Sequence, residues 1–589
     1  MKDGLRDKKS IRKLWYEHQW AIVAACAATV MGIGFIGFSA HFDRLGEKRS
    51  FWDIFYLTIQ LFVLESGSVP VSGNFPLNLA RLMAPAISAY TALLAFLELF
   101  SEQLTALRLK NLSGHSVVFG LNQISFFLIA SLVRDGKKVV VVESDKNNTY
   151  IPSCFEMGAV IVIGNAEEPE TLLKASVNSS EKLYCMGDDD NMNAEIANNA
   201  GALLSETAGR PVECVVNIND PFRCLKLTEN EIIRDKKDRV RYEYFNLYSA
   251  SSSWLVSEYD AFAAGKNTGG RPCLLIAGGG NMAESILVSL ARKWGAAQGR
   301  QPGKFTVALM NENAGNEAEK LLLQYPALTD YCDIDTIQTG LDSNEFKKIS
   351  FLSRADGKKK FDVIYICDTD DSKNMAAAFS LVTPVNELKI TTFACFSHLP
   401  GLIKLYTRND LRNYRHLLTL ELAEKSQIPE MIKRGVRETL ARAIHRDYIE
   451  KSVTAGQQPP VPVFWNDLSN EIKESNRSQA DHIFVKLGDI ECSIAPLFEK
   501  IPEKFEFTKD EIETLAVFEH ERWNEEKIRN GWVFGEKRDE KNKTTPYLVS
   551  YDRLPENIKQ YDRDAVVRIP ELLETAGFRV VRRSDARSS

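Results

Sequence analysis

Two glycine-containing turns have the residue types and spacing that bind phosphate. The first follows an apolar run and carries Gly120, Asn122 and Ser125, and Glu143 ends the next apolar run. In a dinucleotide-binding fold the phosphates lie at the N-terminus of the helix that such a turn begins, and an acid at the end of the second strand binds the ribose. Only one of the three fingerprint positions is glycine here, so this turn alone is a weak signal.

The second turn matches the fingerprint better. Gly278, Gly280 and Ala283 form G-x-G-x-x-A after an apolar run and before a helical pattern, and the next apolar run ends at Asn311 rather than at an acid. This is the context that the fingerprint requires. The two turns predict that the chain binds NAD or another nucleotide. No catalytic set stands beside either turn, so we expect no enzyme.

Each turn needs a sheet and a helix to position it, and the sequence contains two such units. An apolar strand, an acidic turn, an asparagine and a helix occur at 183–197 and again at 361–382. We therefore predict an internal repeat, with Rossmann-like α/β domains over residues 101–250 and 271–400. The repeated pattern places both glycine turns in equivalent positions.

The first unit resembles the regulator-of-potassium-conductance (TrkA-N) family over about 114–219. That family's G-D-A-x-x-P-x-x-L pattern is matched by Gly164, Asn165, Ala166, Pro169 and Leu172, with Asn165 in place of the aspartate. The resemblance implies paired modules that form a ring beneath a pore, with Gly164 and Asp188 among the ligand candidates. For the acids at 188–190, a solvated loop and a helix N-cap region or cation site both remain open.

The N-terminal part of the chain has the pattern of a transmembrane domain, which we place at 19–100. Residues 19–41 carry no formal charge and can span a bilayer, and the basic segment 1–18 before them predicts a cytoplasmic N-terminus. Small residues at Gly32, Gly34 and Gly37 could allow close helix packing. A second span begins near Leu77. Residues 51–65 are apolar but too short to cross, which indicates a re-entrant loop over 51–76.

This order of span, loop and span resembles the pore of two-transmembrane potassium channels. The filter of that family, T-V-G-Y-G, is replaced by Val63, Leu64, Glu65, Ser66 and Gly67. The resemblance implies a homotetramer that conducts a monovalent cation. Four copies of Glu65 could form a carboxylate ring, as in less selective cation pathways. A degenerate pore that only anchors the protein is the alternative.

The C-terminal part reads as a helical region over 411–505, from its three-four spacing of apolar residues, followed by a distinct domain at 506–585. That domain resembles the repeat domain of ryanodine receptors (RyR domain) through residues that include His520, Gly531, Gly535, Pro546 and Leu554. Side chains that could stack on a nucleobase or reach phosphates are Arg522, Trp523, Trp532, Lys537, Tyr547 and Tyr551. Packing in the domain core is the alternative, which we favour for Trp523 and Trp532.

Composition limits the remaining possibilities. A chain of 589 residues is too long for one core. A net charge of −6 argues against binding nucleic acid. Ten scattered cysteines without a C-x-x-C pair fit a reducing compartment and predict no metal site.

The sequence thus predicts a multidomain membrane protein: a two-helix pore-type transmembrane domain, two Rossmann-like domains, and a mostly α C-terminal region ending in an RyR-type domain. The predicted function is a homotetrameric, ligand-gated, potassium-like cation channel in the lipid of the bacterial inner membrane, with both termini cytoplasmic. One alternative is a non-conducting or membrane-disrupting effector in stress or phage defence that senses a nucleotide through its RyR domain. A membrane-tethered oxidoreductase is the other alternative.

Overall fold

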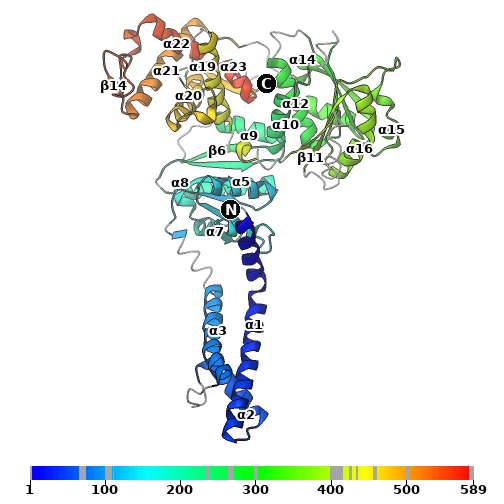
Figure 1. Ribbon diagram of the computed structural model, residues 1–589. Helices are drawn as coiled ribbons and strands as arrows, with labels where there is room; N and C mark the ends of the chain where they lie inside the picture. The colour runs from blue at the N-terminus through cyan, green and yellow to red at the C-terminus, as the bar shows by residue number, and fades with distance from the viewer. Residues whose placement is uncertain are drawn as a thin grey trace. The chain divides into compact units, whose positions relative to one another are not determined.

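The fold is shown in Figure 1 as a computed structural model. It describes residues 3–65, 74–99, 109–110, 112–207, 209–233, 239–262, 271–296, 303–397, 416–422, 428–432, 435–454, 461–498 and 505–582. The chain divides into two compact units, Met1–Asn111 and Leu112–Ser589. Each unit is described by itself.

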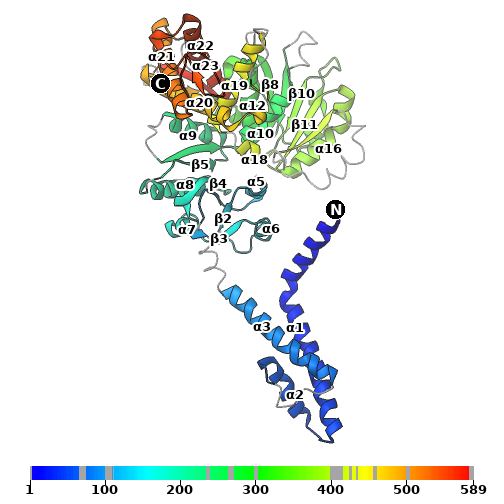
Figure 2. The same ribbon diagram turned by 60° about the vertical axis from the view of Figure 1, so that its left-hand side comes forward.

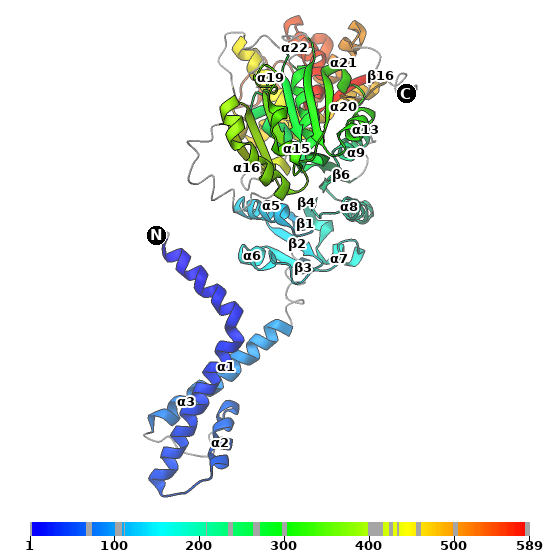
Figure 3. The ribbon, with the colours of Figure 1, turned by 90° about the vertical axis from the view of Figure 1, so that its right-hand side faces the viewer.

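The N-terminal unit consists of two long helices and a short one between them (Figure 3). Its elements are α1 (Asp3–Leu45), α2 (Phe51–Gln60), the 3₁₀ turn η1 (Leu61–Val63) and α3 (Phe75–Leu99). The segments His18–Leu45 and Phe75–Phe96 are long and apolar enough to cross a membrane, as predicted. Helix α2 has only 10 residues. It starts at a capping box in which Ser50 and Asp53 exchange hydrogen bonds.

Helices α1 and α3 pack closely at Gly37. A Cβ atom at Gly37 would lie 2.7 Å from the backbone nitrogen of Leu77, so only glycine permits this approach. The Asn74 amide also donates a hydrogen bond of 2.6 Å to the Gly37 carbonyl. Gly34 faces Thr58 and Leu61, whereas Gly32 has open space around it. The predicted packing role is confirmed for Gly34 and Gly37, whereas Gly32 packs against no other described residue of its own chain.

The first nucleotide-fold sheet is parallel, with strand order β3-β2-β1-β4-β5-β6. Its strands are β1 (His115–Phe119), β2 (Val139–Glu143), β3 (Val160–Ile163), β4 (Ser180–Cys185), β5 (Val212–Asn217) and β6 (Val240–Phe245). Its helices are α5 (Gln123–Arg134), α6 (Ile151–Glu156), α7 (Pro169–Lys174), α8 (Asp190–Ser205) and α9 (Pro221–Ile233). Figure 3 shows α5 and α6 on one side of this sheet and α7 and α8 on the other. This is the strand order of dinucleotide-binding folds.

The second sheet repeats this topology in the order β12-β11-β10-β7-β8-β9, also parallel. Its strands are β7 (Cys273–Ala277), β8 (Phe305–Asn311), β9 (Cys332–Gln338), β10 (Val363–Ile366), β11 (Thr391–Phe396) and β12 (Leu417–Glu421). Its helices are α12 (Gly280–Ala296), α13 (Ala314–Gln324), α14 (Leu328–Tyr331), α15 (Asn344–Lys347) and α16 (Asp371–Leu388), with α16 packed against β10 and β11 (Figure 2). The predicted internal repeat is confirmed.

Strand β12 corrects two predictions. Residues 417–421 were expected to begin the helical region, but they form the sixth strand and pair with β11. The second domain therefore extends beyond residue 400. A short apolar run such as Leu417–Glu421 has no periodicity that separates a strand from a helix, and only its pairing with β11 decides the outcome.

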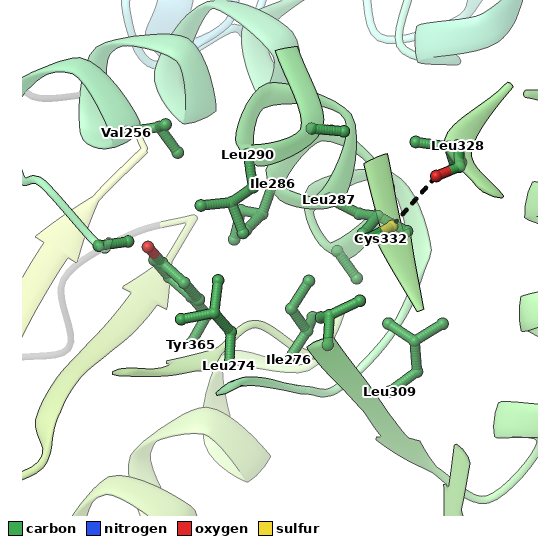
Figure 4. Close-up of a cluster of buried hydrophobic side chains, with 14 of the residues drawn as sticks. Val256, Leu274, Ile276, Ile286, Leu287, Leu290, Leu309, Leu328, Cys332 and Tyr365 are labelled. Carbon is green, nitrogen blue, oxygen red and sulfur yellow. Dashed lines mark hydrogen bonds between the residues drawn. The ribbon is translucent and has the colours of Figure 1, made fainter. Parts of the chain in front are cut away.

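Helix α10 (Leu247–Glu258) follows the first sheet in sequence but packs on the second. Its Val256 lies in one buried cluster with Ile286 and Leu290 of α12, Leu274 of β7 and Tyr365 of β10 (Figure 4). The two nucleotide-fold domains are therefore joined through a shared helix rather than a loose linker. The core cluster of Figure 4 fixes α12, and with it the second glycine turn.

The C-terminal helices form one further core. They are α19 (Val436–Thr454), α20 (Asn470–Asp489), α21 (Lys509–Arg529), α22 (Glu556–Val567) and α23 (Ile569–Ala576). The short helix α18 (Ile428–Ile432), which precedes them, packs on α5 of the first domain instead. Strand β13 (Cys492–Pro496) pairs antiparallel with β16 (Phe578–Arg582), and β14 (Val533–Phe534) pairs with β15 (Thr544–Thr545). Residues from Leu440 to Val580 share this core. The predicted helical region is thus not all helix, and it folds together with the RyR-type domain.

Candidate nucleotide-binding sites

The first glycine turn joins β1 to α5 and is held by side chains predicted for the site. Gly120 has φ +80°, and a Cβ there would lie 2.9 Å from the backbone of Gly187. Asn122 and Ser125 cap α5 by exchanging hydrogen bonds with each other's backbone. The Asn122 amide also donates to the Asp188 carboxylate at 2.8 Å. Gly120, Asn122, Ser125 and Asp188 are therefore brought together, as the sequence predicts.

Glu143 ends β2 as expected, and its carboxylate is bound by the protein itself. It accepts hydrogen bonds from the backbone N–H of Leu121 at 2.8 Å and of Asp145 at 2.8 Å, and from the Asn148 amide at 3.2 Å. The side chain is 8% exposed. Gly164 lies beside it, because its N–H donates to the Glu143 carbonyl. A ribose would have to compete for this carboxylate with the turn that it stabilises.

The second glycine turn joins β7 to α12 and leaves no room for larger residues. Gly278 has φ +123°, and a Cβ there would lie 2.4 Å from the backbone nitrogen of Asp368. Gly280 has φ +75°. Ala283 is buried in the core under α12, where a small residue allows the helix to approach the sheet. All three residues have the roles that the fingerprint requires.

A carboxylate of the protein itself accepts a hydrogen bond from this second turn. The Gly280 N–H donates to the Glu317 carboxylate at 2.9 Å. The Asn311 amide donates to the other Glu317 oxygen at 2.6 Å and to the Gly278 carbonyl at 3.0 Å. Asn311 therefore fixes Glu317 against the turn, where a phosphate would lie in a dinucleotide-binding fold. Sequence reasoning missed Glu317, which lies 37 positions beyond Gly280 and has no local signal.

A cavity of about 160 Å³ opens beside this turn, at the carboxyl ends of the strands of the second sheet. It lies where the strand order reverses between β7 and β10, which is the usual ligand position in such sheets. The cavity is lined by the glycine turn and the start of α12, by the residues that follow β10 and β12, by the start of α16, by the end of β11 and by α10: Gly279, Gly280, Asn281, Met282, Cys367, Asp368, Thr369, Asp371, Cys395, Ser397, Leu422 and Tyr248. The cavity has the location and mixed lining of a small-ligand site.

Two buried asparagines stabilise the strand ends in both repeats. Asn193 accepts from the Gly187 N–H at 2.8 Å and donates to the Asn217 carbonyl at 3.0 Å. Asn374 makes the same pair of bonds with Asp368 and Cys395, at 2.7 and 3.0 Å. Asn193, and not Asn191 next to the acids, is thus the equivalent of Asn374. Its spacing of six residues from the strand end is the signal that identifies it.

The strand ends of the two sheets meet. The Asn281 amide, at the start of α12, donates to the Asn219 carbonyl of the first domain at 2.8 Å. Asn219 in turn donates two hydrogen bonds, from its N–H to the Asp190 carboxylate at 2.7 Å and from its amide to the Asp188 carbonyl at 2.9 Å. Of the acids at 188–190, Asp189 caps α8, so the N-cap interpretation holds there. A short chain of hydrogen bonds therefore links the start of α12 in the second domain to the acids at 188–190 in the first.

The segment between α1 and α3, called the hairpin below and described over residues 51–65, exposes large apolar side chains. Leu64 has φ +65° and is 84% exposed, and Val63 is 76% exposed. The Glu65 N–H donates to the Gln60 carbonyl at 3.1 Å, which ends the short helix, and its side chain is exposed. Ser66 and Gly67, the last two predicted filter residues, lie outside the described residues.

Three of the aromatic residues predicted for the RyR-type domain belong to its core. Trp532 is 5% exposed, with the Lys527 ammonium 4.6 Å and the Arg538 guanidinium 5.9 Å from its ring. Tyr551 is buried with Leu554, and Tyr547 packs against them. The Trp523 ring, half-buried, stacks on His520 with ring centres 5.8 Å apart. Lys537 is exposed.

Arg522 differs from its prediction as a phosphate ligand. It is buried, and its guanidinium donates to Glu519 at 2.8 Å and to Glu526 at 2.5 Å. Lys486 also pairs with Glu519. Burial alone would raise the pKa of Glu519, but Lys486 and Arg522 outweigh it and lower that pKa to about 2. The donors of Arg522 are therefore engaged in a buried ion cluster.

Comparison with known proteins agrees with two of the predicted domains. Residues 116–233 match the TrkA-N domain family, and residues 501–582 match the RyR domain family. Both resemblances drawn from the sequence are confirmed over these segments.

Among solved structures, the chain is similar to the GsuK channel. The similarity has 15% identity and a TM-score of 0.36, and covers 71% of this chain and 98% of that one. GsuK bound to NAD gives 12% identity and a TM-score of 0.36 over 83% of this chain and 87% of that one. GsuK bound to ADP gives 15% identity and a TM-score of 0.35 over 72% and 97%. The chain therefore carries a TrkA-N domain within the first of two Rossmann-like domains, an RyR domain near its C-terminus, and two helices apolar enough to cross a membrane.

Proposed function

We propose that this chain is the subunit of a homotetrameric, nucleotide-gated cation channel of the bacterial inner membrane, with both termini in the cytoplasm. The observation that carries the proposal is the hairpin between two membrane-crossing helices. Helix α2 has 10 residues and is too short to cross a bilayer, whereas the helices before and after it are long enough. A short helix and an irregular loop at membrane depth are stable only where they line a cavity.

The exposed hairpin residues argue for contact between copies. Val63 and Leu64 are large, apolar and among the most exposed side chains of the described residues. In a tetramer, four hairpins surround one axis, and their tips cover one another there. The same arrangement brings four Glu65 carboxylates together, which favours cations over anions. The sequence of this hairpin does not favour selectivity for potassium.

The crevice of the second domain is the proposed nucleotide site. A phosphate of NAD or of another nucleotide would accept the Gly280 N–H bond that Glu317 now accepts. Tyr248 and Met282 offer apolar surface to the remainder of the ligand. The nucleotide acts as a ligand in this proposal, and no catalytic step is assigned to it. Turnover of a bound dinucleotide with any substrate would contradict this part.

Nucleotide binding is coupled to the pore by thermodynamic linkage. A nucleotide shifts the pore equilibrium only by the difference between its affinities for the closed and open arrangements. The covalent path between α3 and β1 is residues 100–114, so a rearrangement of the first domain acts on α3 through a short segment. The hydrogen bond from Asn281 to Asn219 connects the ligand crevice to that first domain.

Ion flux from reconstituted protein tests the proposal. Full-length protein is placed in liposomes, and efflux of a monovalent cation is measured with and without NAD or ADP. We expect flux that a nucleotide changes, and a several-fold change in rate or selectivity for Glu65→Gln. Glu47→Gln, an exposed acid of the same unit paired with Arg49, is the matched control and should behave as wild type. Absence of flux under every condition refutes the channel.

A non-conducting membrane effector that senses through its RyR domain is the second candidate. One observation favours it: among the described residues, no group accepts a hydrogen bond from the buried Trp532 indole N–H, while two cations flank its ring. A flat anionic ligand would satisfy both features. Nucleotide binding that is lost in Trp532→Phe and kept in Glu317→Ala, without ion flux, would select this candidate.

A further inference from the structure

Each glycine turn is closed by a carboxylate of the protein itself, but the two carboxylates are held differently. In the first repeat, Glu143 accepts hydrogen bonds from the backbone N–H groups of Leu121 and Asp145 and from the side chains of Ser144 and Asn148. It is 8% exposed and belongs to β2. Its removal would leave the N–H of the buried Leu121 without an acceptor. Glu143 is therefore a fixed part of the first turn.

Glu317 closes the second turn with fewer bonds. Among the described residues it accepts from two donors, the Gly280 N–H at 2.9 Å and the Asn311 amide at 2.6 Å. Its side chain reaches the turn from the start of α13 and is half-buried. A Cβ at Gly279 would lie 2.8 Å from one carboxylate oxygen, so the carboxylate lies directly against the backbone of the turn. Glu317 thus takes the phosphate position without belonging to a strand of the sheet.

The second turn does not depend on Glu317 for its shape. The Asn311 amide also donates to the Gly278 carbonyl at 3.0 Å, and the Asn311 side-chain oxygen accepts from the Asn313 N–H at 2.8 Å. These bonds remain when Glu317 leaves. The Gly280 N–H and one N–H of the Asn311 amide then stay in place as a pair of donors for phosphate oxygens.

A released Glu317 carboxylate has a favourable position close by. It belongs to the first turn of α13, where the helix dipole stabilises a negative charge. The N-cap residue of this helix, Asn313, makes no side-chain capping hydrogen bond, so the N–H groups of that turn are open to the carboxylate or to water. Leaving the glycine turn therefore costs Glu317 two hydrogen bonds but does not leave its charge buried and unsolvated.

We propose that Glu317 is a tethered competitor for phosphate at the second glycine turn, and that it restricts this position to ligands that carry a phosphate group. This inference rests on the nucleotide site of the proposed function. A phosphate needs the same two donors as Glu317, and two negative groups this close repel each other. The phosphate must therefore expel Glu317 to bind. A nucleoside has no anionic group to replace the carboxylate, so it leaves Glu317 on the turn.

Binding of ADP and of adenosine to the full-length protein in detergent tests the proposal. Glu317→Ala removes the competitor and keeps both donors. Its affinity for ADP should rise about tenfold to a hundredfold, the factor that corresponds to one hydrogen bond to a charged group. Adenosine should bind equally weakly to both proteins, whereas a general widening of the crevice would change both ligands. Glu317→Gln keeps an oxygen acceptor without the charge, so it should raise the affinity for ADP by a smaller factor.

Glu319→Ala is the matched control, because Glu319 is an exposed acid of the same helix and its loss changes the net charge equally. It should bind ADP as wild type does. Amide hydrogen exchange locates the ligand, since ADP at the turn should slow exchange at 279–282. If ADP protects these amides but binds no tighter to Glu317→Ala than to wild type, the competitor role is wrong and the nucleotide site stands. If ADP does not bind, or binds without protecting 279–282, the nucleotide site fails together with this inference.

Discussion

Replacing Gly278 by alanine tests whether the second glycine turn is shaped by its contact with β10. The residue has φ +123°, which residues with a side chain rarely adopt. The new Cβ would lie 2.4 Å from the Asp368 nitrogen and 2.5 Å from the Cys367 carbonyl carbon. Both are backbone atoms of the neighbouring strand end, so no side chain can turn aside to make room.

The expected loss of stability in Gly278→Ala follows from the strained backbone conformation and from the clash of the new Cβ. Backbone strain costs about 1 to 3 kcal/mol and overpacking about another 1 to 3 kcal/mol, so we expect a loss of roughly 3 kcal/mol or more in the second domain. Gly136 separates the two terms, because it has φ +76° and nothing within 4 Å of its would-be Cβ. Gly136→Ala should cost only about 1 to 2 kcal/mol.

Amide hydrogen exchange measures this loss of stability at individual residues. The Cys367 N–H bonds the Ala277 carbonyl at 2.8 Å, directly beside the clash. A loss of about 3 kcal/mol corresponds to roughly 100-fold faster exchange of this amide through local opening. The first domain should keep its protection in Gly278→Ala. If β7 and β10 lose no more protection in Gly278→Ala than the first sheet loses in Gly136→Ala, the close approach described here is wrong.

Two further substitutions test other parts of the structure. Gly37→Val should push α3 away from α1 at Leu77 and break the Asn74 hydrogen bond, destabilising the N-terminal unit by about 1 to 3 kcal/mol in detergent unfolding. Gly32→Val, with open space around it, should unfold as wild type does, and equal effects of the two would contradict the packing. Arg522→Met should leave Glu526 buried without its cation and cost about 3 to 5 kcal/mol in thermal unfolding of the C-terminal part. Arg538→Met removes an exposed pair with Glu540 and one of the two cations beside the Trp532 ring, and should cost only about 1 kcal/mol, so a similar loss in both variants would refute a buried ion cluster.

The sequence predicts the parts of this fold that local pattern specifies. Gly278, Gly280 and Ala283 identify the second turn because three small residues at fixed spacing, all within six positions, are what a tight turn before a helix requires. The repeat of strand, acidic turn and asparagine identifies both domains, and the hydropathy of residues 19–41 identifies the first membrane helix. These features depend on neighbours along the chain.

What the sequence does not predict depends on partners far along the chain. Glu317 takes the phosphate position only because α13 brings it back to the turn. The strand Leu417–Glu421 is recognised only by its pairing with β11, and β13 only by its pairing with β16. Arg522 is an intermediate case. Glu519 and Glu526 stand three positions before it and four after it on one helix, so their spacing could have indicated an ion cluster rather than a ligand site.

A density map of the assembled protein in lipid tests the central claim most directly. We expect four copies around one axis, with Leu64 and Glu65 of each copy lining that axis within the membrane. With NAD or ADP present, we expect ligand density at Gly280 and displacement of the Glu317 carboxylate from the turn. Hairpins that face lipid, with no axis between them, would contradict the channel whatever occupies the crevice.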